Sequence, residues 1–455
     1  MTDLLAVILA AGKGTRMKSA LPKVLHSIGG KPMVEHVLNA AQTAGAKRKV
    51  VVVGFGAESV ETTLGTQAEY VIQAEQLGTG HAVMQAGDLL QGFDGTVMVL
   101  CGDTPLLRGQ TLTKLVAEHQ ALQASATVLT ACMTDPTGYG RVIRDDNGQI
   151  LKIVEQKDAT SSELAVNEVN TGIYCFDRAA LFDALRSINC NNMQGEYYLT
   201  DVIDILVKSQ GKAKVYAVQV DDVEETLGIN SRMQLAEAEK ILRRRKLVSL
   251  MDNGVTIMDI DSTFIDDQVC IEPDTVIYPF TWIEGATTIG RGSAIGPNSR
   301  IQNSSIGENT TLHFTYAHDC QIGNGVTVGP YVHLRPNTVL ADGVKIGNFV
   351  EVKNSQVGTG SKIPHLSYIG DTDMGEKVNI GSGTITVNYD GKKKHRTILE
   401  DGAFIGCNTN LVAPVTVGKG AYVAAGSTIT KDVPSDALGV ARARQSNIEG
   451  WVNRK

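Results

Sequence analysis

The segment Ile283-Glu-Gly-Ala-Thr-Thr-Ile289-Gly-Arg-Gly-Ser-Ala-Ile295-Gly-Pro-Asn-Ser-Arg-Ile301 repeats one pattern with a period of six residues. An aliphatic residue opens each unit, glycine often follows it, and a small residue stands at the fifth place. Such repeats predict a parallel β-helix, in which each unit forms one short side of a coil and its aliphatic side chain stacks on the coil below. The glycines ease the turns.

The same spacing returns over most of the second half of the chain, with small shifts of phase. The aliphatic positions of the repeat are Ile271, Ile277, Ile283, Ile289, Ile295, Ile301, Val328, Leu334, Leu340, Ile346, Val352, Val357, Ile363, Met374, Ile380, Leu399, Ile405, Leu411, Val417, Val423 and Ile429. One sizeable interruption, residues 386–397, is predicted to leave the coil as a loop. It contains the turn sequence Asn388-Tyr-Asp-Gly391 and the basic run Lys392-Lys-Lys-His-Arg396.

The first half follows a different rule. Apolar, β-rich runs at residues 5–10, 49–53 and 96–100 alternate with helical patterns at residues 33–44, 57–64 and 111–121. This alternation predicts a mainly parallel sheet with helices on both faces, and such sheets bind ligands at the carboxyl ends of their strands. We therefore expect one domain over residues 1–229, a helical linker over 230–250, and the β-helix with a C-terminal arm over 251–455. The basic run Arg243-Arg-Arg-Lys246 is interpreted as a solvated helix face.

Composition excludes several classes of protein. The formal charge of -7 argues against a general nucleic-acid binder. The seven cysteines are scattered without C-x-x-C spacing, which favours neither a disulfide framework nor a zinc site and fits a reducing cytoplasm. The apolar run at the N-terminus is too short to span a bilayer, so membrane insertion is not expected.

A glycine-rich loop follows the first predicted strand. Leu9-Ala-Ala-Gly-Lys-Gly-Thr-Arg-Met17, with Leu21-Pro-Lys23 after it, brings backbone N–H groups and two cations, Arg16 and Lys23, to one place that suits a phosphate chain. It matches neither G-x-x-x-x-G-K-[ST] nor G-x-G-x-x-G. Asp103 follows the strand that ends at Cys101-Gly102, and there we favour a ligand over a residue that only caps a turn. His81 is interpreted as local loop packing.

These features together resemble a known family. The loop, with Gln73, Gln76-Leu-Gly-Thr-Gly-His81, Gly102-Asp103, Gly138-Tyr-Gly-Arg141, Glu155, Asn170-Thr-Gly172 and Asn230, resembles the sugar-1-phosphate nucleotidylyltransferases. When the repeats are included, the likeness covers nearly the whole chain. The chain as a whole is similar to the bifunctional N-acetylglucosamine-1-phosphate uridylyltransferase and glucosamine-1-phosphate N-acetyltransferase family.

The resemblance implies a Rossmann-like α/β nucleotidyltransferase domain followed by a left-handed β-helix. It implies N-acetylation of glucosamine-1-phosphate by acetyl-CoA, then Mg²⁺-dependent uridylyl transfer from UTP, which supplies UDP-N-acetylglucosamine for peptidoglycan and lipopolysaccharide. It further implies a cytoplasmic homotrimer, in which the C-terminal arm with Arg442, Arg444 and Trp451 reaches a neighbouring subunit.

The resemblance also assigns residues of the uridylyl site. Arg16 and Lys23 would be catalytic, and Asp103 and Asn230 would hold Mg²⁺. The nucleotide sugar would contact Leu9, Ala10, Ala11, Gly12, Lys23, Gln73, Gly78, Thr79, Cys101, Gly102, Asp103, Gly140, Glu155, Asn170 and Asn230. Of its two parts, uracil would be held by Gln73, Gly78 and Thr79, and the sugar by residues 138–140, Glu155 and Asn170. Cys101 stands where the family commonly has an aromatic residue, so the nucleotide contact there is expected to differ.

Polar residues just after inward aliphatic positions of the repeat mark a second site. His365 is the expected base, because transfer of an acetyl group to an amine requires a group that takes a proton near neutral pH. By resemblance, glucosamine-1-phosphate would contact Arg335, Lys353, Tyr368, Asn379 and Asn388, and acetyl-CoA would contact Ser382, Asn388, Tyr389, Cys407, Ala425 and Arg442. Cys407 replaces a serine, so weaker binding of CoA is expected. For the basic run of residues 392–396 two interpretations stay open and are given equal weight: a solvated loop, or a contact for the phosphates of CoA.

Two alternatives remain. The first is a nucleotidylyltransferase with one activity, for ADP-glucose or dTDP-glucose, whose β-helix is only structural; Arg335, Lys353 and His365 argue against it. The second is a non-enzymatic subunit that kept the fold and lost the chemistry. Such a subunit would have lost residues of the first site, yet Arg16, Lys23, Asp103 and Asn230 are all present.

Overall fold

The computed structural model describes residues 3–209 and 214–454. Contacts divide the chain into two compact units, Met1–Leu242 and Arg243–Lys455. The division falls inside one continuous helix, α8, which runs from Arg232 to Asp252. The separate role of residues 230–250 as a linker stays a prediction.

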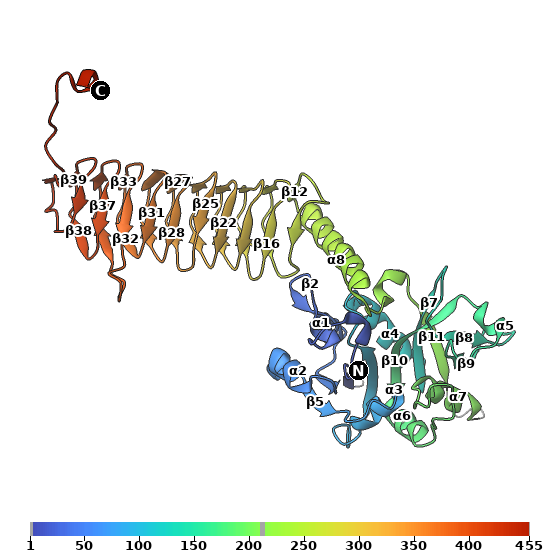
Figure 1. Ribbon diagram of the computed structural model, residues 1–455. Helices are drawn as coiled ribbons and strands as arrows, with labels where there is room; N and C mark the ends of the chain where they lie inside the picture. The colour runs from blue at the N-terminus through green and yellow to red at the C-terminus, as the bar shows by residue number, and fades with distance from the viewer. Residues whose placement is uncertain (1–2, 210–213, 455) are drawn as a thin grey trace. The chain divides into compact units, whose positions relative to one another are not determined.

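A mixed sheet forms the centre of the first unit (Figure 1). Its strands are β1 Asp3–Leu9, β4 Arg48–Val53, β5 Glu69–Ile72, β6 Gly95–Cys101, β7 Ala126–Cys132, β8 Arg141–Arg144, β9 Ile150–Val154, β10 Glu168–Asp177 and β11 Val215–Gln219. The order is β11-β7-β10-β6-β1-β4-β5, and the β8–β9 hairpin attaches to β10. A separate two-stranded hairpin pairs β2 Ser27–Ile28 with β3 Lys31–Pro32.

The predicted mainly parallel sheet is confirmed, apart from β10 and the β8–β9 hairpin, whose strands are antiparallel. Strand β1 is parallel to β4 and β6, β4 to β5, and β7 to β11, whereas β10 is antiparallel to both of its neighbours. A parallel neighbour needs a crossover that returns the chain to the starting end of the sheet. The chain enters β10 from the β8–β9 hairpin through the short α5, Ser161–Leu164, without such a crossover.

Helices cover both faces of this sheet, as predicted. Alternate residues of β1 face different cores: Ala6 and Ile8 pack with the helices of one face, and Leu5 and Val7 with those of the other. The first group is α1 Met33–Thr43, α2 Ala57–Leu64 and α4 Gly109–Ala121. The second group is α3 Thr79–Gln85, α6 Arg178–Leu185 and α7 Thr200–Lys208.

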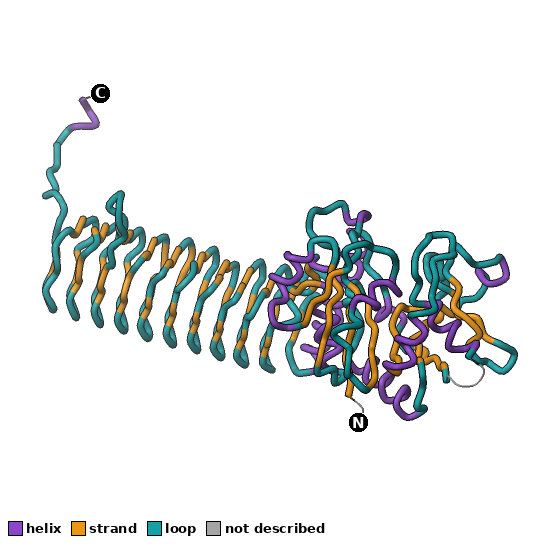
Figure 2. The backbone as a smooth tube through the Cα atoms, turned by 90° about the horizontal axis from the view of Figure 1, so that it is seen from below, coloured by secondary structure: helices purple, strands orange, loops and turns teal. Residues whose placement is uncertain are grey.

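Three parallel sheets wind into a β-helix in the second unit (Figure 2). Sheet one contains β12 Thr256–Ile257, β15 Val276–Ile277, β18 Ala294–Ile295, β21 Thr311–Leu312, β24 Thr327–Val328, β27 Lys345–Asn348, β30 Lys362–His365, β33 Asn379–Ile380, β36 Phe404–Ile405, β39 Tyr422–Val423 and β41 Leu438–Gly439. Sheet two contains β13 Phe264–Ile265, β16 Trp282–Glu284, β19 Arg300–Gln302, β22 Thr315–His318, β25 Val332–Leu334, β28 Glu351–Lys353, β31 Tyr368–Gly370, β34 Ile385–Val387, β37 Asn410–Val412 and β40 Thr428–Ile429. Sheet three contains β14 Cys270–Ile271, β17 Thr288–Ile289, β20 Ser305–Ile306, β23 Gln321–Ile322, β26 Val339–Leu340, β29 Gln356–Val357, β32 Thr372–Met374, β35 Thr397–Leu399 and β38 Val415–Val417.

The interior of the coil confirms the six-residue pattern. All of the predicted aliphatic positions are buried in one continuous core. Most serines and threonines at the fifth place are buried as well, and their hydroxyls bond to backbone carbonyls of the same coil or of the next one; Ser293 Oγ donates to Gly307 O at 3.0 Å and Ser361 Oγ to Gly375 O at 2.8 Å. These hydroxyls are thus satisfied inside an otherwise apolar core. The predicted architecture, an α/β domain with helices on both faces of its sheet followed by a β-helix of six-residue repeats, is confirmed.

The basic end of α8 is not a simple solvated face. The guanidinium of Arg243 lies over the ring of Phe264 at 4.2 Å, and Lys246 Nζ donates to the carbonyls of Asp267 and Val269, at 2.7 Å each. Leu247 joins the β-helix core. The interpretation of this run as solvated was wrong for Arg243 and Lys246, because the helix covers the open end of the first coil. Among the described residues, no helix has the length and apolarity needed to cross a membrane.

The predicted loop leaves the coil between β34 and β35, but it is shorter than residues 386–397, because Thr386 and Val387 end β34 and Thr397 begins β35. Tyr389 pairs with Lys394 in an isolated antiparallel bridge, and Asp390 Oδ2 lies 2.7 Å from Nε2 of His395. The backbone N–H groups of Lys392 and Lys393 both donate to Asp390 Oδ1 at 2.7 Å. The excursion is therefore a compact, self-bonded turn, called the insertion loop below (residues 388–396).

Two neighbouring residues of β35 give a matched test of the stacked core. Leu399 is 1% exposed and Ile398 is 43% exposed. Leu399→Ala is expected to lower the free energy of unfolding of the β-helix by about 2–5 kcal/mol, because it leaves a cavity between coils. Ile398→Ala should cost less than about 1 kcal/mol. Calorimetric melting of the full chain measures both, and equal losses would contradict the inward stacking.

Candidate active sites

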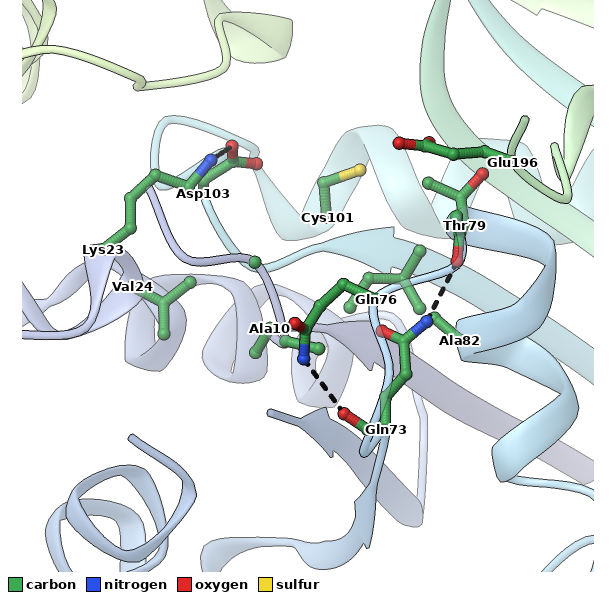
Figure 3. A pocket seen from close by; sticks show the side chains of 14 residues that line it. Ala10, Lys23, Val24, Gln73, Gln76, Thr79, Ala82, Cys101, Asp103 and Glu196 are labelled. Carbon is green, nitrogen blue, oxygen red and sulfur yellow. Dashed lines mark hydrogen bonds and ion pairs between the residues drawn. The ribbon is translucent and has the colours of Figure 1, made fainter. Parts of the chain in front are cut away.

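A pocket of about 260 Å³ opens at the carboxyl ends of β1 and β6 (Figure 3). Its position agrees with the rule for ligands of parallel sheets. The residues that line it are Leu9, Ala10, Ala11, Gly12, Lys23, Val24, Gln73, Gln76, Gly78, Thr79, Ala82, Cys101, Asp103 and Glu196. Most of the predicted nucleotide contacts therefore meet at one place.

The glycine-rich loop is shaped around Lys23. Gly14 has a φ of 60°, and a Cβ at that position would lie 2.6 Å from Cβ of Lys23. Only glycine allows this close approach, so the loop and the lysine stem pack directly against each other. Arg16 is exposed on the adjoining 3₁₀ turn Thr15–Met17 and does not line the pocket; its catalytic role stays a prediction.

Lys23 joins the two residues expected to hold the metal. Its Nζ lies 2.5 Å from Oδ2 of Asp103 and donates to Oδ1 of Asn230 at 3.0 Å. The side chains of Lys23 and Asp103 are 14% and 18% exposed. Two oxygens from distant parts of the chain thus converge on one cation inside the pocket, and an oxygen pair of this kind suits Mg²⁺.

A second pocket of about 200 Å³ adjoins the first. It is lined by Leu9, Thr79, Cys101, Gly138, Tyr139, Gly140, Glu155, Asn170, Thr171, Gly172, Tyr174, Leu199 and Thr200. Leu9, Thr79 and Cys101 line both pockets. Burial raises the pKa of Glu155, and the nearby Asp158 carboxylate raises it further. The predicted sugar contacts Gly140, Glu155 and Asn170 therefore share one cavity beside the nucleotide pocket.

Several lining residues were missed. Gln76 lay within a quoted motif but was given no role. Glu196 and Thr200 come from a segment whose sequence carries no phosphate-loop or repeat signal. Their place follows from the approach of that segment to α3, where Gly80 N donates to Tyr197 O at 2.8 Å.

In the second unit, three successive coils bring predicted residues together on sheet two. Arg335 follows β25, Lys353 ends β28 and Tyr368 begins β31. Arg335 Nη1 donates to Oε1 of Glu351 at 2.8 Å. Glu351 was not predicted, although it stands only two positions before Lys353. Asn379 lies on β33 of sheet one, so the single chain does not place it on the strands that carry Tyr368 and Lys353.

A second group forms a column at the edge of sheet one. His365, Ser382, Cys407 and Ala425 each stand two positions after an inward aliphatic residue, and those aliphatics are in register through successive coils. His365 is exposed, and its Nδ1 lies 2.8 Å from Oδ1 of Asn348, its partner on β27. An amide oxygen only accepts, so Nδ1 carries the hydrogen and Nε2 keeps its lone pair. Arg442 Nη1 donates to the carbonyl of Ala425 at 2.8 Å, which brings the start of the arm to this column.

Asp371 holds the base of the insertion loop. This buried carboxylate accepts from Nδ2 of Asn354 and from Nδ2 of Asn388, at 2.5 Å each. Asn388 Nδ2 also lies 3.5 Å from the hydroxyl of Tyr368. The predicted sugar ligands Tyr368 and Asn388 are thereby brought together by a residue that the sequence analysis did not single out.

The insertion loop also brings Lys394 to Lys353. Contact with the Lys394 side chain is the main cause that lowers the pKa of Lys353, and burial adds to it. Two like charges this close together repel each other, and an anion bound between them would relieve the repulsion. The structure thus places one lysine of the basic run beside the predicted sugar-phosphate residues, whereas the sequence left the run open between solvent and CoA phosphates. Tyr389 is exposed and donates its hydroxyl to Gly391 O at 2.8 Å.

The two departures from the family pattern differ in environment. Burial raises the pKa of the Cys101 thiol to about 12, and the Asp103 carboxylate adds to the shift. Cys407 is exposed.

Alkylation with iodoacetamide at pH 7.5 tests this difference. The thiolate fraction of Cys101 should be on the order of a thousandfold below that of an ordinary thiol, because its pKa is raised by burial. Mass spectrometry of tryptic peptides should show rapid labelling of Cys407 and of the exposed Cys270, which serves as the control, and slow labelling of Cys101. Equal rates at Cys101 and Cys407 would contradict the raised pKa of the Cys101 thiol.

Comparisons with known proteins agree with both halves. Residues 5–223 match the nucleotidyl transferase family, and residues 319–354 and 396–431 match the bacterial transferase hexapeptide family. Proteins named bifunctional protein GlmU are similar over the full length: 58% identity in Geobacillus sp. (strain WCH70), covering 100% of this chain and 98% of that protein, and 54% in Halalkalibacterium halodurans, covering 100% of both. The relative in Listeria monocytogenes is 51% identical, covering 99% of this chain and 98% of that protein.

A solved structure of UDP-glucose pyrophosphorylase complexed with UDP-glucose covers 54% of this chain and 100% of its own, at 20% identity and a TM-score of 0.44, a likeness too low to carry an assignment. The full-length relatives decide the matter, and the predicted family is confirmed. Because proteins more than half identical match it from end to end, the chain belongs to the bifunctional GlmU family, and it joins a nucleotidyltransferase to a hexapeptide-repeat transferase.

Proposed function

We propose that this chain acetylates the amine of glucosamine-1-phosphate with acetyl-CoA and then transfers UMP from UTP to the product, which gives UDP-N-acetylglucosamine and pyrophosphate. One observation carries the proposal: each compact unit holds its own set of polar groups, and each set fits one of these reactions. Lys23, Asp103 and Asn230 line or adjoin a nucleotide-sized pocket, and Arg335, Lys353 and His365 lie on neighbouring coils. The product would serve as a precursor of peptidoglycan and lipopolysaccharide.

Uridylyl transfer needs alignment and charge neutralisation more than a base. A phosphate oxygen of N-acetylglucosamine-1-phosphate attacks the α-phosphorus of UTP, and the bond from that phosphorus to the oxygen that bridges to the β-phosphate breaks. Lys23 stabilises negative charge at the phosphates, and the glycine-rich loop offers backbone N–H groups. Asp103 Oδ2 and Asn230 Oδ1 would hold Mg²⁺, which when bound would neutralise charge on the phosphate oxygens.

Acetyl transfer requires a neutral amine and a place for its proton. The amine nitrogen attacks the thioester carbonyl, and Nε2 of His365 accepts the proton that the nitrogen loses. The imidazole then gives this proton to the sulfur as the C–S bond breaks, so that CoA leaves as the thiol. Asn348 fixes the ring so that Nε2 is the accepting nitrogen. The column of Ser382, Cys407 and Ala425 beyond His365 would carry the pantetheine arm, and a backbone N–H near Ser382 would stabilise the oxyanion.

Three cations would bind the phosphate of glucosamine-1-phosphate. Arg335 and Lys353 lie on adjacent coils of sheet two, and the insertion loop adds Lys394. Tyr368 and Asn388 stand beside them to contact the sugar. We therefore propose that Lys394 binds the sugar phosphate and not CoA.

The proposed compartment follows from the substrates, and the proposed oligomeric state follows from the surface of the β-helix. UTP and acetyl-CoA are cytoplasmic metabolites, so the cytoplasm is the expected compartment. A homotrimer is supported by an exposed apolar corner of the β-helix, where Tyr331 and Phe349 are 57% and 56% exposed and stack with ring centroids 5.4 Å apart. A neighbouring chain at such a corner would cover these rings and bring its C-terminal arm to the column of His365.

A single assay separates the two activities. Purified full-length protein with Mg²⁺ receives glucosamine-1-phosphate, acetyl-CoA and UTP, and release of free thiol and of pyrophosphate is followed separately. His365→Ala should lose about 10²- to 10⁴-fold of the thiol release, because the amine proton has no acceptor, and should keep pyrophosphate release from supplied N-acetylglucosamine-1-phosphate. Asp103→Ala, and likewise removal of Mg²⁺ with EDTA, should abolish most of the pyrophosphate release and leave the thiol release unchanged.

Each rival function predicts a different result. Pyrophosphate release without any thiol release, even with glucosamine-1-phosphate present, would leave a nucleotidylyltransferase with a structural β-helix. Release of neither product would indicate a non-enzymatic subunit. Higher activity with ATP or dTTP and glucose-1-phosphate than with UTP would overturn the proposed substrates.

The basic run offers a second matched test. Lys394→Gln should raise the KM for glucosamine-1-phosphate about tenfold with a smaller change in kcat, because one of three charge-assisted contacts to the phosphate is lost. Its removal should also let the pKa of Lys353 rise toward the ordinary value, since contact with Lys394 is what lowers it. Lys392→Gln, an exposed lysine of the same loop, is the control and should change KM less than about twofold. A raised KM for acetyl-CoA instead would assign Lys394 to CoA.

A further inference from the structure

A buried carboxylate, that of Asp371, stands beside the residues proposed to bind the sugar. Asp371 follows β31 at a corner of the coil and is 5% exposed. Its backbone is bonded on two sides, because its N–H donates to Lys353 O at 3.0 Å and its carbonyl accepts from Thr397 N at 3.1 Å. The carboxylate is therefore held in a fixed place between the coil of β28 and the strand that follows the insertion loop.

This carboxylate is ionised near neutral pH. Burial alone would raise the pKa of Asp371, but hydrogen bonds from Asn354 and Asn388 lower it. The nearby charges of Lys353 and Lys394 lower the pKa further, so that it lies below its ordinary value. An ionised carboxylate has no hydrogen, and both of its oxygens can only accept.

The ionised carboxylate decides how the amide of Asn388 is turned. Asn388 is 8% exposed, and one of its amide atoms lies 2.5 Å from Oδ2 of Asp371. That atom has to be the nitrogen, because a carboxylate oxygen and an amide oxygen have no hydrogen to share. The same nitrogen lies 3.5 Å from the hydroxyl oxygen of Tyr368, which is also able to accept. The two contacts therefore agree on the orientation of the amide.

The oxygen of this amide is left unused. Among the hydrogen bonds of the part of the chain that the structure describes, none is accepted by Oδ1 of Asn388. Glycine at position 370 makes room for the arrangement, because a Cβ there would lie 2.5 Å from the hydroxyl oxygen of Tyr368 and 2.8 Å from Nδ2 of Asn388. Both side chains thus close over the backbone of Gly370, and the amide oxygen remains as a free acceptor.

We propose that Asp371 is a positioning residue for acetyl transfer, which holds the amide of Asn388 with its oxygen toward the sugar. The inference rests on the proposed acetylation of glucosamine-1-phosphate at the same site. An acceptor in this place binds an O–H or N–H group of the sugar. A reversed amide would present its own N–H groups there and lose this contact, at a cost typical of one hydrogen bond.

Two glycine variants at neighbouring corners form a matched test. Asp371 and Asn354 have φ values of 50° and 45°, at which glycine is unstrained, and each variant removes one partner of the hydrogen bond between them. Asp371→Gly frees the amide of Asn388 and should lower kcat/KM for glucosamine-1-phosphate, measured by thiol release, about tenfold. Asn354→Gly leaves the bond between Asp371 and Asn388 and should change this value less than about twofold.

An exchange of the two side chains separates orientation from packing. Asn388→Asp alone sets two carboxylates against each other and should lower the same kcat/KM by at least about tenfold. Asp371→Asn combined with Asn388→Asp restores one amide and one carboxylate. The new amide nitrogen donates to the new carboxylate, its oxygen still accepts from Asn354, and the outer carboxylate oxygen remains an acceptor for the sugar. The double variant should therefore return to within about threefold of the unmutated value.

Two controls report on folding. Calorimetric melting of the full chain shows whether the β-helix of each variant is intact, and pyrophosphate release from UTP and N-acetylglucosamine-1-phosphate should be unchanged in all of them. The exchanged variants keep the volume of both side chains, so they decide the question even if Asp371→Gly fails to fold.

The outcomes distinguish the inference from the function on which it rests. Unmutated protein that releases no thiol from acetyl-CoA would overturn the proposed function itself. Active unmutated protein, together with a folded Asp371→Gly variant that loses no more than Asn354→Gly, would overturn the inference alone. A double variant as impaired as Asn388→Asp would also overturn it, because the hydrogen bond would then be restored without its effect.

Discussion

The stacking of one inward aliphatic residue per six positions determines everything built on the second unit. Because each coil lies in register on the next, an outward residue at a given offset from its aliphatic neighbour falls at a fixed place along the β-helix. His365, Ser382, Cys407 and Ala425 share one such offset. A functional surface thus arises from the spacing of buried side chains, with little help from loops.

The first unit positions its groups by another rule. There the residues come from the ends of separate strands and from the loops that follow them, and contacts between distant segments have to hold them together. Lys23 and Asn230 are 207 positions apart, yet one hydrogen bond joins them. The close packing of Gly14 on Lys23 and the hydrogen bond from Gln73 Nε2 to the Gly78 carbonyl serve the same purpose, since each restricts the motion of a polar side chain that lines the pocket.

Periodic patterns could be predicted because the position of each residue in them depends on its neighbours along the chain. The inward positions from Ile271 to Ile429, the loop at residues 386–397 and the strand that ends before Asp103 all follow from local spacing. The direction of β10 did not, because it depends on how the chain returns from a hairpin. The hydrogen bond from Asn388 to Asp371 and the contact of Lys394 with Lys353 were not predicted either. Both involve the insertion loop, whose backbone is irregular and does not follow the six-residue spacing from which the coil was predicted. The contacts of Arg243 and Lys246 show the same limit, since a basic run looks alike whether it faces water or a carbonyl.

The way α8 closes the first coil has a consequence for association between molecules. A β-helix that simply stopped would present a row of unpaired backbone groups, and such an edge pairs readily with the edge of another chain. Here Lys246 occupies the carbonyls of Asp267 and Val269, and Leu247 and Leu250 seal the apolar interior. The helix therefore also caps the first coil against end-to-end association of molecules. The same 21 residues that connect the two halves of the chain disfavour the formation of fibres.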